Sequence, residues 1–395
     1  MAFTAEQIDV TCPACGHRGL AGFHDQPSVP VNSCLLVTDR AEAVDFPQGA
    51  IRLGLCPDCG FMTNTAFDPA LAEYSQRYEE TQGFSPRFLQ FARTLATEWI
   101  ERYDLSGKRV LEIGCGKGEF LALMAEGGIG HGIGIDPGVD PDRVTSPAAE
   151  RLTWLQRRFT ADDGDLIGDA VVCRHTLEHI GPVGAFLADL RRAIGDRVDT
   201  VVLFELPDSQ RVLDEVAFWD VYYEHAAYFT EGSLSRLFER HGFEILDLRK
   251  EYDDQYLILE AKPNAGAGGR PRAADDLAAI FHGAETFRSG YAAAADYWRQ
   301  RLAAESASGG RTVIWGASSK GVAFLGIAGD QVAAAVDVNP HKHGTYVAGT
   351  GHRVLSPREL QEVRPSLVVA MNPIYLDEIG TELEALGIEA TLIGV

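Results

Sequence analysis

Two CxxC pairs near the start of the chain have the spacing of metal ligands. The four thiols belong to Cys12 and Cys15 in the first pair and Cys56 and Cys59 in the second, and a glycine follows each pair. Four cysteines in this pattern supply the tetrahedral soft-ligand set of structural Zn²⁺. A catalytic zinc keeps an open position and usually includes His or a carboxylate among its ligands. The sequence therefore predicts a closed structural zinc site.

The 40 or so residues between the two pairs look rich in loops and too poor in apolar pattern to form a core alone. We therefore expect metal binding to be coupled to folding of this segment. Cys34 lies inside it, and we interpret this cysteine as a small buried side chain rather than a fifth ligand.

A second group able to do chemistry is Tyr222-Tyr223-Glu224-His225. Two tyrosines, a carboxylate and an imidazole in consecutive positions, outside any amphipathic repeat, are difficult to explain as core residues. His225 can remove a proton near pH 7, Glu224 can orient it, and the hydroxyl of Tyr222 can donate to a developing oxyanion. A polar loop hydrogen-bonded to itself is the alternative.

His179 and Tyr78 are further candidates. His179 comes just after the apolar run at 170–173, and residues beyond the carboxyl ends of parallel strands line the ligand crevice. A role of His179 limited to shaping the pocket stays open. Tyr78 belongs to a polar and aromatic stretch at 74–87, which we expect to fold over the site as a lid.

A glycine-rich turn follows the strand-like run at 109–113. Its glycines let a ligand press against the backbone at a helix N-terminus. A dinucleotide fingerprint needs Gly or Ala at position 119, where this chain has Glu119. The pattern E-x-G-x-G-x-G resembles instead the first motif of class I S-adenosylmethionine (SAM)-dependent methyltransferases. The resemblance implies SAM as the cofactor, with contacts from Glu112, Gly114, Cys115, Gly116 and Gly118.

An acidic residue ends the next strand-like run. Asp136 lies twenty residues after Gly116 and precedes Pro137, which we include in the predicted site. A carboxylate in this position can accept hydrogen bonds from both ribose hydroxyls of the cofactor. An ordinary turn residue at a strand end is the alternative. The later stretch Leu177-Glu178-His179-Ile180 adds support for a SAM site.

The composition and hydrophobic pattern along the chain predict an α/β protein with three parts. Residues 1–70 form the expected zinc-binding module, and 71–262 alternate strand-like and helical patterns, as in a Rossmann-like parallel sheet. Residues 263–273 have the composition of a flexible linker. A long helix is expected from 274 to 306, and 274–395 as a whole form a second, smaller Rossmann-like α/β domain.

Composition excludes several classes of partner. A formal net charge of −22 over 395 residues, without a basic run, argues against nucleic acid and anionic membrane surfaces. No apolar run approaches the roughly 18 residues of a membrane span, and the first residues lack the features of a secretory signal. We expect a cytoplasmic enzyme with a small-molecule substrate, and the oligomeric state stays open.

Nearly the whole chain resembles the sugar C-methyltransferases that act on nucleotide-linked 4-keto-deoxysugars. The resemblance includes the Cys₄ module, the Tyr-x-Glu-His motif and the C-terminal runs 315–321 and 336–346. It implies that a base forms an enolate beside the ketone and that the enolate carbon attacks the SAM methyl group. It makes His225 the base, Glu224 its partner and Tyr222 an active-site hydroxyl, with His179 and Tyr78 as oxyanion or substrate contacts.

The C-terminal part also contains a glycine-bounded turn suited to a diphosphate, with Ser318, Ser319 and Lys320. A degenerate turn that binds nothing is the alternative. Where the family has a Trp-Asn-Phe-like segment, this chain reads Met-Asn-Pro, which retains Asn372 as a substrate contact. Methylation of another small metabolite, with this domain as a scaffold, is the runner-up. A non-catalytic zinc- and SAM-binding protein is disfavoured, because binding alone needs no base.

Overall fold

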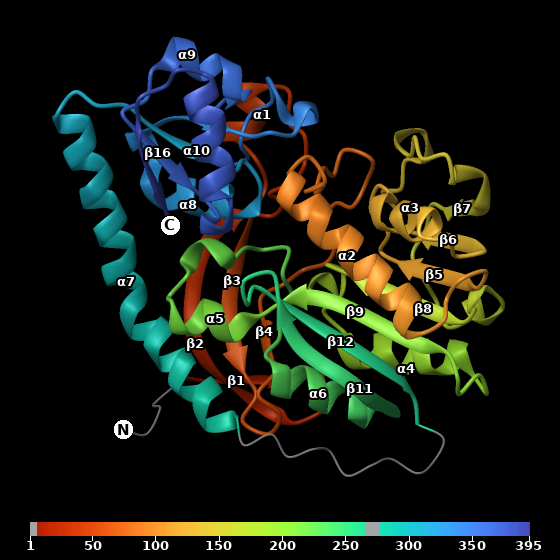
Figure 1. Ribbon diagram of the computed structural model, residues 1–395. Coiled ribbons are helices and arrows are strands. Elements are labelled where there is room, and N and C mark those ends of the chain that lie inside the picture. The colour runs from red at the N-terminus through yellow and green to blue at the C-terminus, as the bar shows by residue number, and fades with distance from the viewer. Residues whose placement is uncertain (1–5, 265–275) are drawn as a thin grey trace.

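The computed structural model describes residues 6–264 and 276–395, and its core is built on three β-sheets (Figure 1). The expected linker at 263–273 lies outside these residues except for its first two positions, and Pro263 is the last residue of a strand. Within the described residues, no helix is both long enough and apolar enough to cross a membrane.

The first sheet is antiparallel, with the order β1-β2-β3-β4-β10. Its strands are β1 (Glu6–Thr11), β2 (Arg18–Pro30), β3 (Gln48–Leu55), β4 (Met62–Asn64) and β10 (Ala227–Tyr228), and α1 (Arg40–Val44) lies between β2 and β3. The expectation of a loop-rich segment is wrong. Ile51 and Leu53 are buried on either side of exposed Arg52, which is the period-two pattern of a half-buried strand.

The central sheet has the order β11-β12-β9-β8-β5-β6-β7. The five strands β7, β6, β5, β8 and β9 are parallel to one another. At the other edge, β12 pairs antiparallel with β9, and β11 pairs antiparallel with β12. The strands are β5 (Arg109–Ile113), β6 (His131–Ile135), β7 (Leu152–Leu155), β8 (Ala170–Arg174), β9 (Val201–Pro207), β11 (Phe243–Glu251) and β12 (Tyr256–Pro263). This order and direction confirm the expected class I methyltransferase fold.

Helices cover both faces of the central sheet. They are α2 (Pro86–Arg102), α3 (Glu119–Glu126), α4 (Val183–Ile194) and α6 (Glu231–Arg240), whereas the buried side chains of α5 (Ser209–Asp214) belong to the apolar cluster of the first sheet. Apolar side chains of α2 and α3 pack with Val110 and Val172 on one face, and those of α4 and α6 pack with Leu111 and Val171 on the other. Neighbouring residues of a strand therefore pack into the helix layers on opposite faces of the sheet. This explains why these strands are continuous apolar runs in the sequence.

The C-terminal unit has a parallel sheet with the order β15-β14-β13-β16-β17. Its elements are β13 (Thr312–Trp315), α8 (Ser319–Ala328), β14 (Val332–Val336), β15 (Val354–Leu355), α9 (Leu360–Val363), β16 (Leu367–Ala370), α10 (Leu376–Ala385) and β17 (Thr391–Gly394). The long helix α7 (Leu277–Ala307) precedes it and packs against α5, β2 and α8. Figure 1 shows α7 along one side of the molecule, running from beside the first sheet to the C-terminal unit.

Short 3-10 helices complete the chain. They are η1 (Pro141–Arg143), η2 (Ala149–Arg151), η3 (Asp163–Leu166), η4 (Leu177–His179), η5 (Phe218–Asp220), η6 (Gly329–Gln331), η7 (Pro340–Lys342), η8 (Pro357–Glu359) and η9 (Pro373–Tyr375). Several of them, η4, η5 and η7 included, supply residues that line the central cavity described below.

Residues 73–85, which we call the strap, run between β4 and α2 and contact all three parts. Tyr78 forms an isolated β-bridge with Leu35 beside the first sheet. The buried carboxylate of Glu79 accepts hydrogen bonds from Arg143 of the central unit, at 2.7 Å, and from Asn339 of the C-terminal unit, at 2.8 Å. The strap is thus held by charge-assisted bonds at a position where three units meet.

A buried carboxylate fixes α2 to the central sheet. The side chain of Glu260, on β12, is fully buried and accepts hydrogen bonds from Trp99 (2.9 Å), Arg102 (2.7 Å), Tyr103 (2.5 Å) and Arg249 (2.7 Å). Burial raises the pKa of Glu260, but these donors outweigh it and lower the pKa. The carboxylate therefore stays charged, and its partners hold the C-terminal end of α2 against the sheet.

We expect Glu260→Ala to destabilise the protein by about 3–5 kcal/mol, because it leaves buried donors and two arginines without their common partner. The midpoint of urea unfolding, followed by circular dichroism, measures the change. The control is Glu244→Ala on neighbouring β11, which removes an exposed contact of 3.6 Å to Lys262. That change should cost less than about 1 kcal/mol, and equal losses in the two variants would contradict the role of Glu260.

Candidate active site

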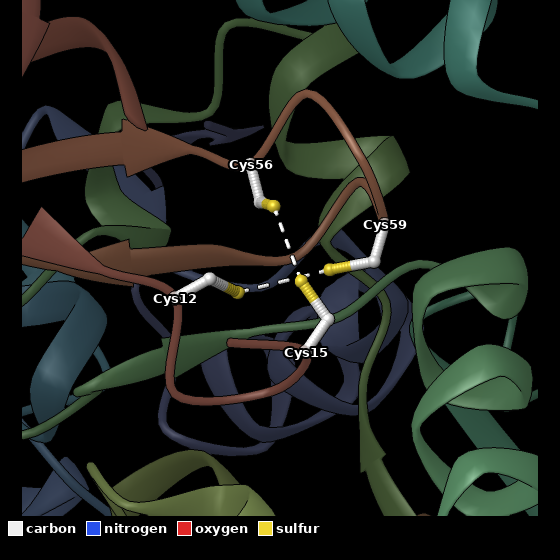
Figure 2. Close-up of side chains that lie close together, drawn as sticks. All are labelled: Cys12, Cys15, Cys56 and Cys59. Atoms are coloured by element: carbon white, nitrogen blue, oxygen red, sulfur yellow. Dashed lines mark hydrogen bonds between the residues drawn. The ribbon is translucent and has the colours of Figure 1, made fainter. Parts of the chain in front are cut away.

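The four predicted metal ligands meet at one point. Figure 2 shows their side chains directed toward one another from two turns, which join β1 to β2 and β3 to β4. The sulfur of Cys12 lies 3.7 Å from that of Cys59, and the sulfur of Cys15 lies 3.6 Å from that of Cys56. All four are free thiols whose sulfurs lie within 4.8 Å of one another.

This arrangement fits a tetrahedral zinc ion. Zn–S bonds of about 2.3 Å place neighbouring sulfurs about 3.8 Å apart, close to the spacing found here. The glycine after each pair has a positive φ, +82° at Gly16 and +70° at Gly60, and its N–H donates to the carbonyl of the first cysteine of the pair. The turns are therefore shaped by left-handed glycines, as their sequence suggests.

A cavity of about 1140 Å³ lies between the central unit, the strap and the C-terminal unit. It is large enough for two small molecules. Of the residues predicted from the sequence, it is lined by Tyr78, Glu112, Gly114, Cys115, Gly116, Asp136, Pro137, His179, Tyr222, His225, Ser318, Ser319, Lys320 and Asn372. Gly118 and Glu224 do not line it.

The glycine turn forms one end of the cavity. Gly114 and Gly116 have positive φ, and a Cβ on Gly114 would collide with the side chain of Thr176. Gly118 also has a positive φ, but it caps α3 and packs against Trp154, so its part is conformational. The turn presents backbone to the cavity at the beginning of α3, the geometry suited to close ligand approach.

Two carboxylates face this end. Asp136 follows β6, and its two oxygens accept hydrogen bonds from the amides of Gly116 (3.2 Å) and Gly138 (2.6 Å). These bonds tie the strand end to the glycine turn and orient the carboxylate. Glu112, at the end of β5, is buried with an unpartnered Oε2, and burial raises its pKa to about 8.

The aromatic and imidazole side chains gather in the middle of the cavity. The ring of His225 lies 4.1 Å from that of Tyr222 and 5.0 Å from that of His179, measured between centroids. Nδ1 of His179 lies 3.1 Å from the carbonyl oxygen of Glu224 and 3.0 Å from the hydroxyl of Tyr74. Because a carbonyl oxygen can only accept, Nδ1 of His179 carries a hydrogen.

The environment sets the protonation of this group. Burial, together with the neighbouring His179, His175 and Lys320, holds the pKa of His225 well below its usual range. Burial also raises the pKa of Tyr222 well above 10. At neutral pH the imidazole is therefore a neutral proton acceptor, and the phenol keeps its proton and can donate it in a hydrogen bond.

Glu224 does not have the expected role of partner to His225. Its carboxylate accepts hydrogen bonds from the amide (2.9 Å) and the hydroxyl (2.6 Å) of Ser33, on the segment after β2. The hydroxyl of Ser319 in turn lies 2.7 Å from that of Ser33. The correction has a physical reason: a fully buried carboxylate needs strong donors, and Ser33 supplies two of them.

The C-terminal glycine turn lies at the other side of the cavity. Lys320, expected to contact a diphosphate, is paired with the buried carboxylate of Asp220 at 2.7 Å. Ser318 contacts the ammonium group of Lys342. The side-chain amide of Asn372 exchanges hydrogen bonds with that of Gln255, at 2.8 and 3.1 Å. Together with Ser319, which contacts Ser33, all four predicted residues lie at the cavity wall and are already engaged by protein partners.

Sequence reasoning missed Asp337, although its signal was visible. This carboxylate ends β14 and accepts from the amides of Ala317 (3.0 Å) and Asn339 (2.9 Å), and it lies twenty residues after Ala317. Asp136 has the same relation to Gly116 in the central unit. The spacing that indicated Asp136 would also have found Asp337.

A buried ion pair beside the cavity was also missed. Glu205, at the end of β9, accepts hydrogen bonds from Arg174 (2.5 Å) and from His175 (2.8 Å). Burial lowers the pKa of His175, but Glu205 and Glu178 outweigh it and raise the pKa to about 9. Burial likewise raises the pKa of Glu205, and Arg174 and His175 bring it to about 2. A local sequence pattern cannot predict an ion pair that forms between two strands.

Two family models match the chain. The model of a methyltransferase domain covers residues 86–248, and that of a C-methyltransferase C-terminal domain covers 279–391. The C-methyltransferase NovU of Streptomyces niveus is 25% identical over 405 residues, which are 93% of this chain and 90% of that protein. The chain is a SAM-dependent methyltransferase. The same matches support transfer to carbon.

Two further proteins match only part of this methyltransferase. The ribosomal protein L11 methyltransferase of Aliivibrio salmonicida is 28% identical over 134 residues, 31% of this chain and 40% of that protein. A solved 1,6-didemethyltoxoflavin-N1-methyltransferase from Burkholderia thailandensis is 19% identical, with a TM-score of 0.33 over 45% of this chain and 82% of that chain. The enzyme class follows from the family models and from NovU, and these two alignments add nothing on the acceptor.

The pair of His175 and Glu205 makes stability dependent on pH. The folded-state pKa of His175 is raised from about 6.5 to about 9, so its contribution is fully present below pH 6.5 and is lost as the pH rises through 9. The shift corresponds to up to about 3 kcal/mol. We expect melting temperatures measured at pH 6.5 and 9.5 to differ less in His175→Gln than in the unchanged methyltransferase.

The control is His131→Gln, which removes a histidine on β6 that contacts Thr153 at an exposed site. This variant should keep the full difference between the two pH values. A His175→Gln protein that loses as much stability as the unchanged protein between these pH values would contradict the role of the pair.

Proposed function

We propose that this methyltransferase transfers the methyl group of SAM to the carbon beside the ketone of a nucleotide-linked 4-keto-deoxysugar. One observation carries the proposal: three features line the same cavity of about 1140 Å³. They are the glycine turn after β5, the group of His225, Tyr222 and His179, and the C-terminal glycine turn. Donor, base and acceptor carrier can therefore share one enclosed space. The similarity to C-methyltransferase NovU along nearly the whole chain supports carbon as the methyl acceptor.

In this proposal His225 is the base. The ketone makes the adjacent C–H acidic, the proton moves to the imidazole of His225, and the electrons of the C–H bond form an enolate. The enolate carbon attacks the methyl group in line, so that a C–C bond forms, the S–CH₃ bond breaks and S-adenosylhomocysteine leaves. The position of His225 in the cavity beside Tyr222 and His179 supports this role, since its unprotonated imidazole can accept a proton.

Neighbouring side chains then stabilise the enolate. The protonated hydroxyl of Tyr222 is suited to donate to the enolate oxygen. Tyr78 and His179 are assigned to contacts with the oxyanion or the sugar. Glu224 supports the site indirectly, because its carbonyl accepts from His179 and its carboxylate is held by Ser33.

The C-terminal turn is assigned to the diphosphate of the acceptor. Ser319 and the amides at the start of α8 offer neutral donors at a helix N-terminus. Lys320 adds a positive charge that Asp220 holds in place. Asn372 is assigned to the nucleotide-sugar as well, and its bond to Gln255 would orient it.

The Cys₄ cluster is proposed to hold structural Zn²⁺ through Cys12, Cys15, Cys56 and Cys59. Sulfur spacing close to that of a tetrahedral site supports the proposal. The metal would cross-link the two turns of the first sheet.

A panel of nucleotide 4-keto-deoxysugars incubated with SAM tests the substrate class. Mass spectrometry should find a product heavier by one methylene group, and deuterium at the carbon beside the ketone should be lost from a labelled acceptor. Methylation of an unrelated small metabolite, with none of the panel, would reject the sugar and favour a scaffold role for the C-terminal unit.

We expect His225→Asn to lower kcat by at least about 100-fold, because it removes the proton acceptor and keeps a side chain of similar size. SAM affinity, measured by calorimetry, should change by less than about twofold. His282→Asn, at an exposed position on α7, is the matched control and should leave both values unchanged. Full turnover in His225→Asn would exclude His225 as the base.

Metal removal tests the zinc proposal. Elemental analysis should find one zinc per chain, and a strong chelator should lower the melting temperature by several degrees, because binding stabilises only the folded state. Cys56→Ser should melt at the lower temperature without chelator and should not respond to it. A chelated protein that keeps its melting temperature and has lost its zinc would disprove a structural role.

A further inference from the structure

The strap places a carboxylate against the glycine turn that follows β5. Glu80 lines the cavity next to Gly116, so closely that a Cβ on this glycine would collide with Oε1 of Glu80. The other oxygen, Oε2, is buried and has no hydrogen-bond partner among the described residues. Buried carboxylate oxygens are normally hydrogen-bonded, so an unpartnered one at a cavity wall indicates a donor that the protein itself does not supply.

The surroundings of Glu80 favour a cationic ligand. Asp136 and Glu112 face the same end of the cavity, and Glu79 is the next residue along the strap. The cation whose charge acts on Glu80 is Lys117, and its ammonium group donates to two backbone carbonyls, those of Gln76 (3.2 Å) and Gly138 (3.0 Å). Burial, together with Asp136 and Glu79, raises the pKa of Glu80 to about 7, against the opposing charge of Lys117. Two arginines near this end are already paired, Arg143 with Glu79 and Arg174 with Glu205, so the charge of Glu80 lacks a bonded partner within the part of the chain that the structure describes.

We propose that Glu80 binds the α-ammonium group of SAM. The proposal rests on the SAM dependence of the chain and is independent of the nature of the acceptor. SAM carries two positive charges, on its ammonium and on its sulfonium, but only the ammonium has N–H groups. Because Oε2 of Glu80 lacks a hydrogen-bond donor as well as a countercharge, the ammonium group satisfies both needs and the sulfonium only one.

The position of Glu80 on the strap adds a consequence for specificity. The cofactor would be held from the central unit by the glycine turn and from the opposite side by the strap, whose neighbouring Glu79 is bonded to Asn339 of the C-terminal unit. Recognition of the amino-acid end of SAM therefore depends on a segment outside the central sheet.

Calorimetry with two ligands tests the contact. The ligands are S-adenosylhomocysteine and its deamino analogue, in which hydrogen replaces the amino group. They are titrated into the full-length protein, Glu80→Gln and the control Glu73→Gln, which changes an exposed carboxylate on the same strap. We expect Glu80→Gln to lower the affinity for S-adenosylhomocysteine about tenfold or more, and the affinity for the deamino analogue by less than about twofold. The control should leave both affinities unchanged.

Three results would overturn the proposal. An equal loss of affinity for both ligands would show that Glu80 contacts the ribose or stabilises the fold. An unchanged affinity for both would show that Glu80 does not contact the cofactor. The third needs no variant: equal affinity of the unchanged protein for the two ligands would show that the ammonium group has no charged partner. No acceptor is present in any titration, so these outcomes stay distinct from failure of the sugar proposal.

Discussion

The two hydrogen bonds from Ser33 to the carboxylate of Glu224 hold the molecule together around its cavity. Glu224 is fully buried, and removing its donors would leave an uncompensated charge, at a cost of several kcal/mol. Ser33 lies after β2 of the first sheet, and its hydroxyl also touches Ser319 of the C-terminal unit. One carboxylate therefore joins three parts of the chain. His225 follows it directly, so the backbone of the proposed base is fixed by a contact made 191 residues away.

Two similar half-sites face this cavity. In each, a glycine turn follows the first strand of a parallel sheet and an aspartate ends the second strand, with its carboxylate tied to the turn by backbone amides. Ligands of parallel sheets bind beyond the carboxyl ends of the strands. Because both sheets direct these ends toward the same space, a donor molecule and an acceptor molecule can approach each other without either leaving its own sheet.

Local patterns predicted much of this arrangement. The glycine turn, Asp136 and the cysteine pairs follow from spacing within a few tens of residues, and strands β5, β6, β8 and β9 follow from apolar runs such as 170–173. Pairings between distant segments had no such signal. The bond of Glu224 to Ser33 and that of Lys320 to Asp220 depend on the assembled fold. The first sheet was missed because register shifts in β2 interrupt its alternation.

Strand β10 consists of only two residues, Ala227 and Tyr228, yet it completes the edge of the first sheet by pairing with β4. The amide and carbonyl groups of β4 are therefore satisfied by the loop that contains His225. A first sheet transplanted from another protein would have to match this loop in register as well as in shape. The cysteine-bearing sheet and the loop that contains the proposed base must therefore match each other, although some 160 residues separate them in the chain.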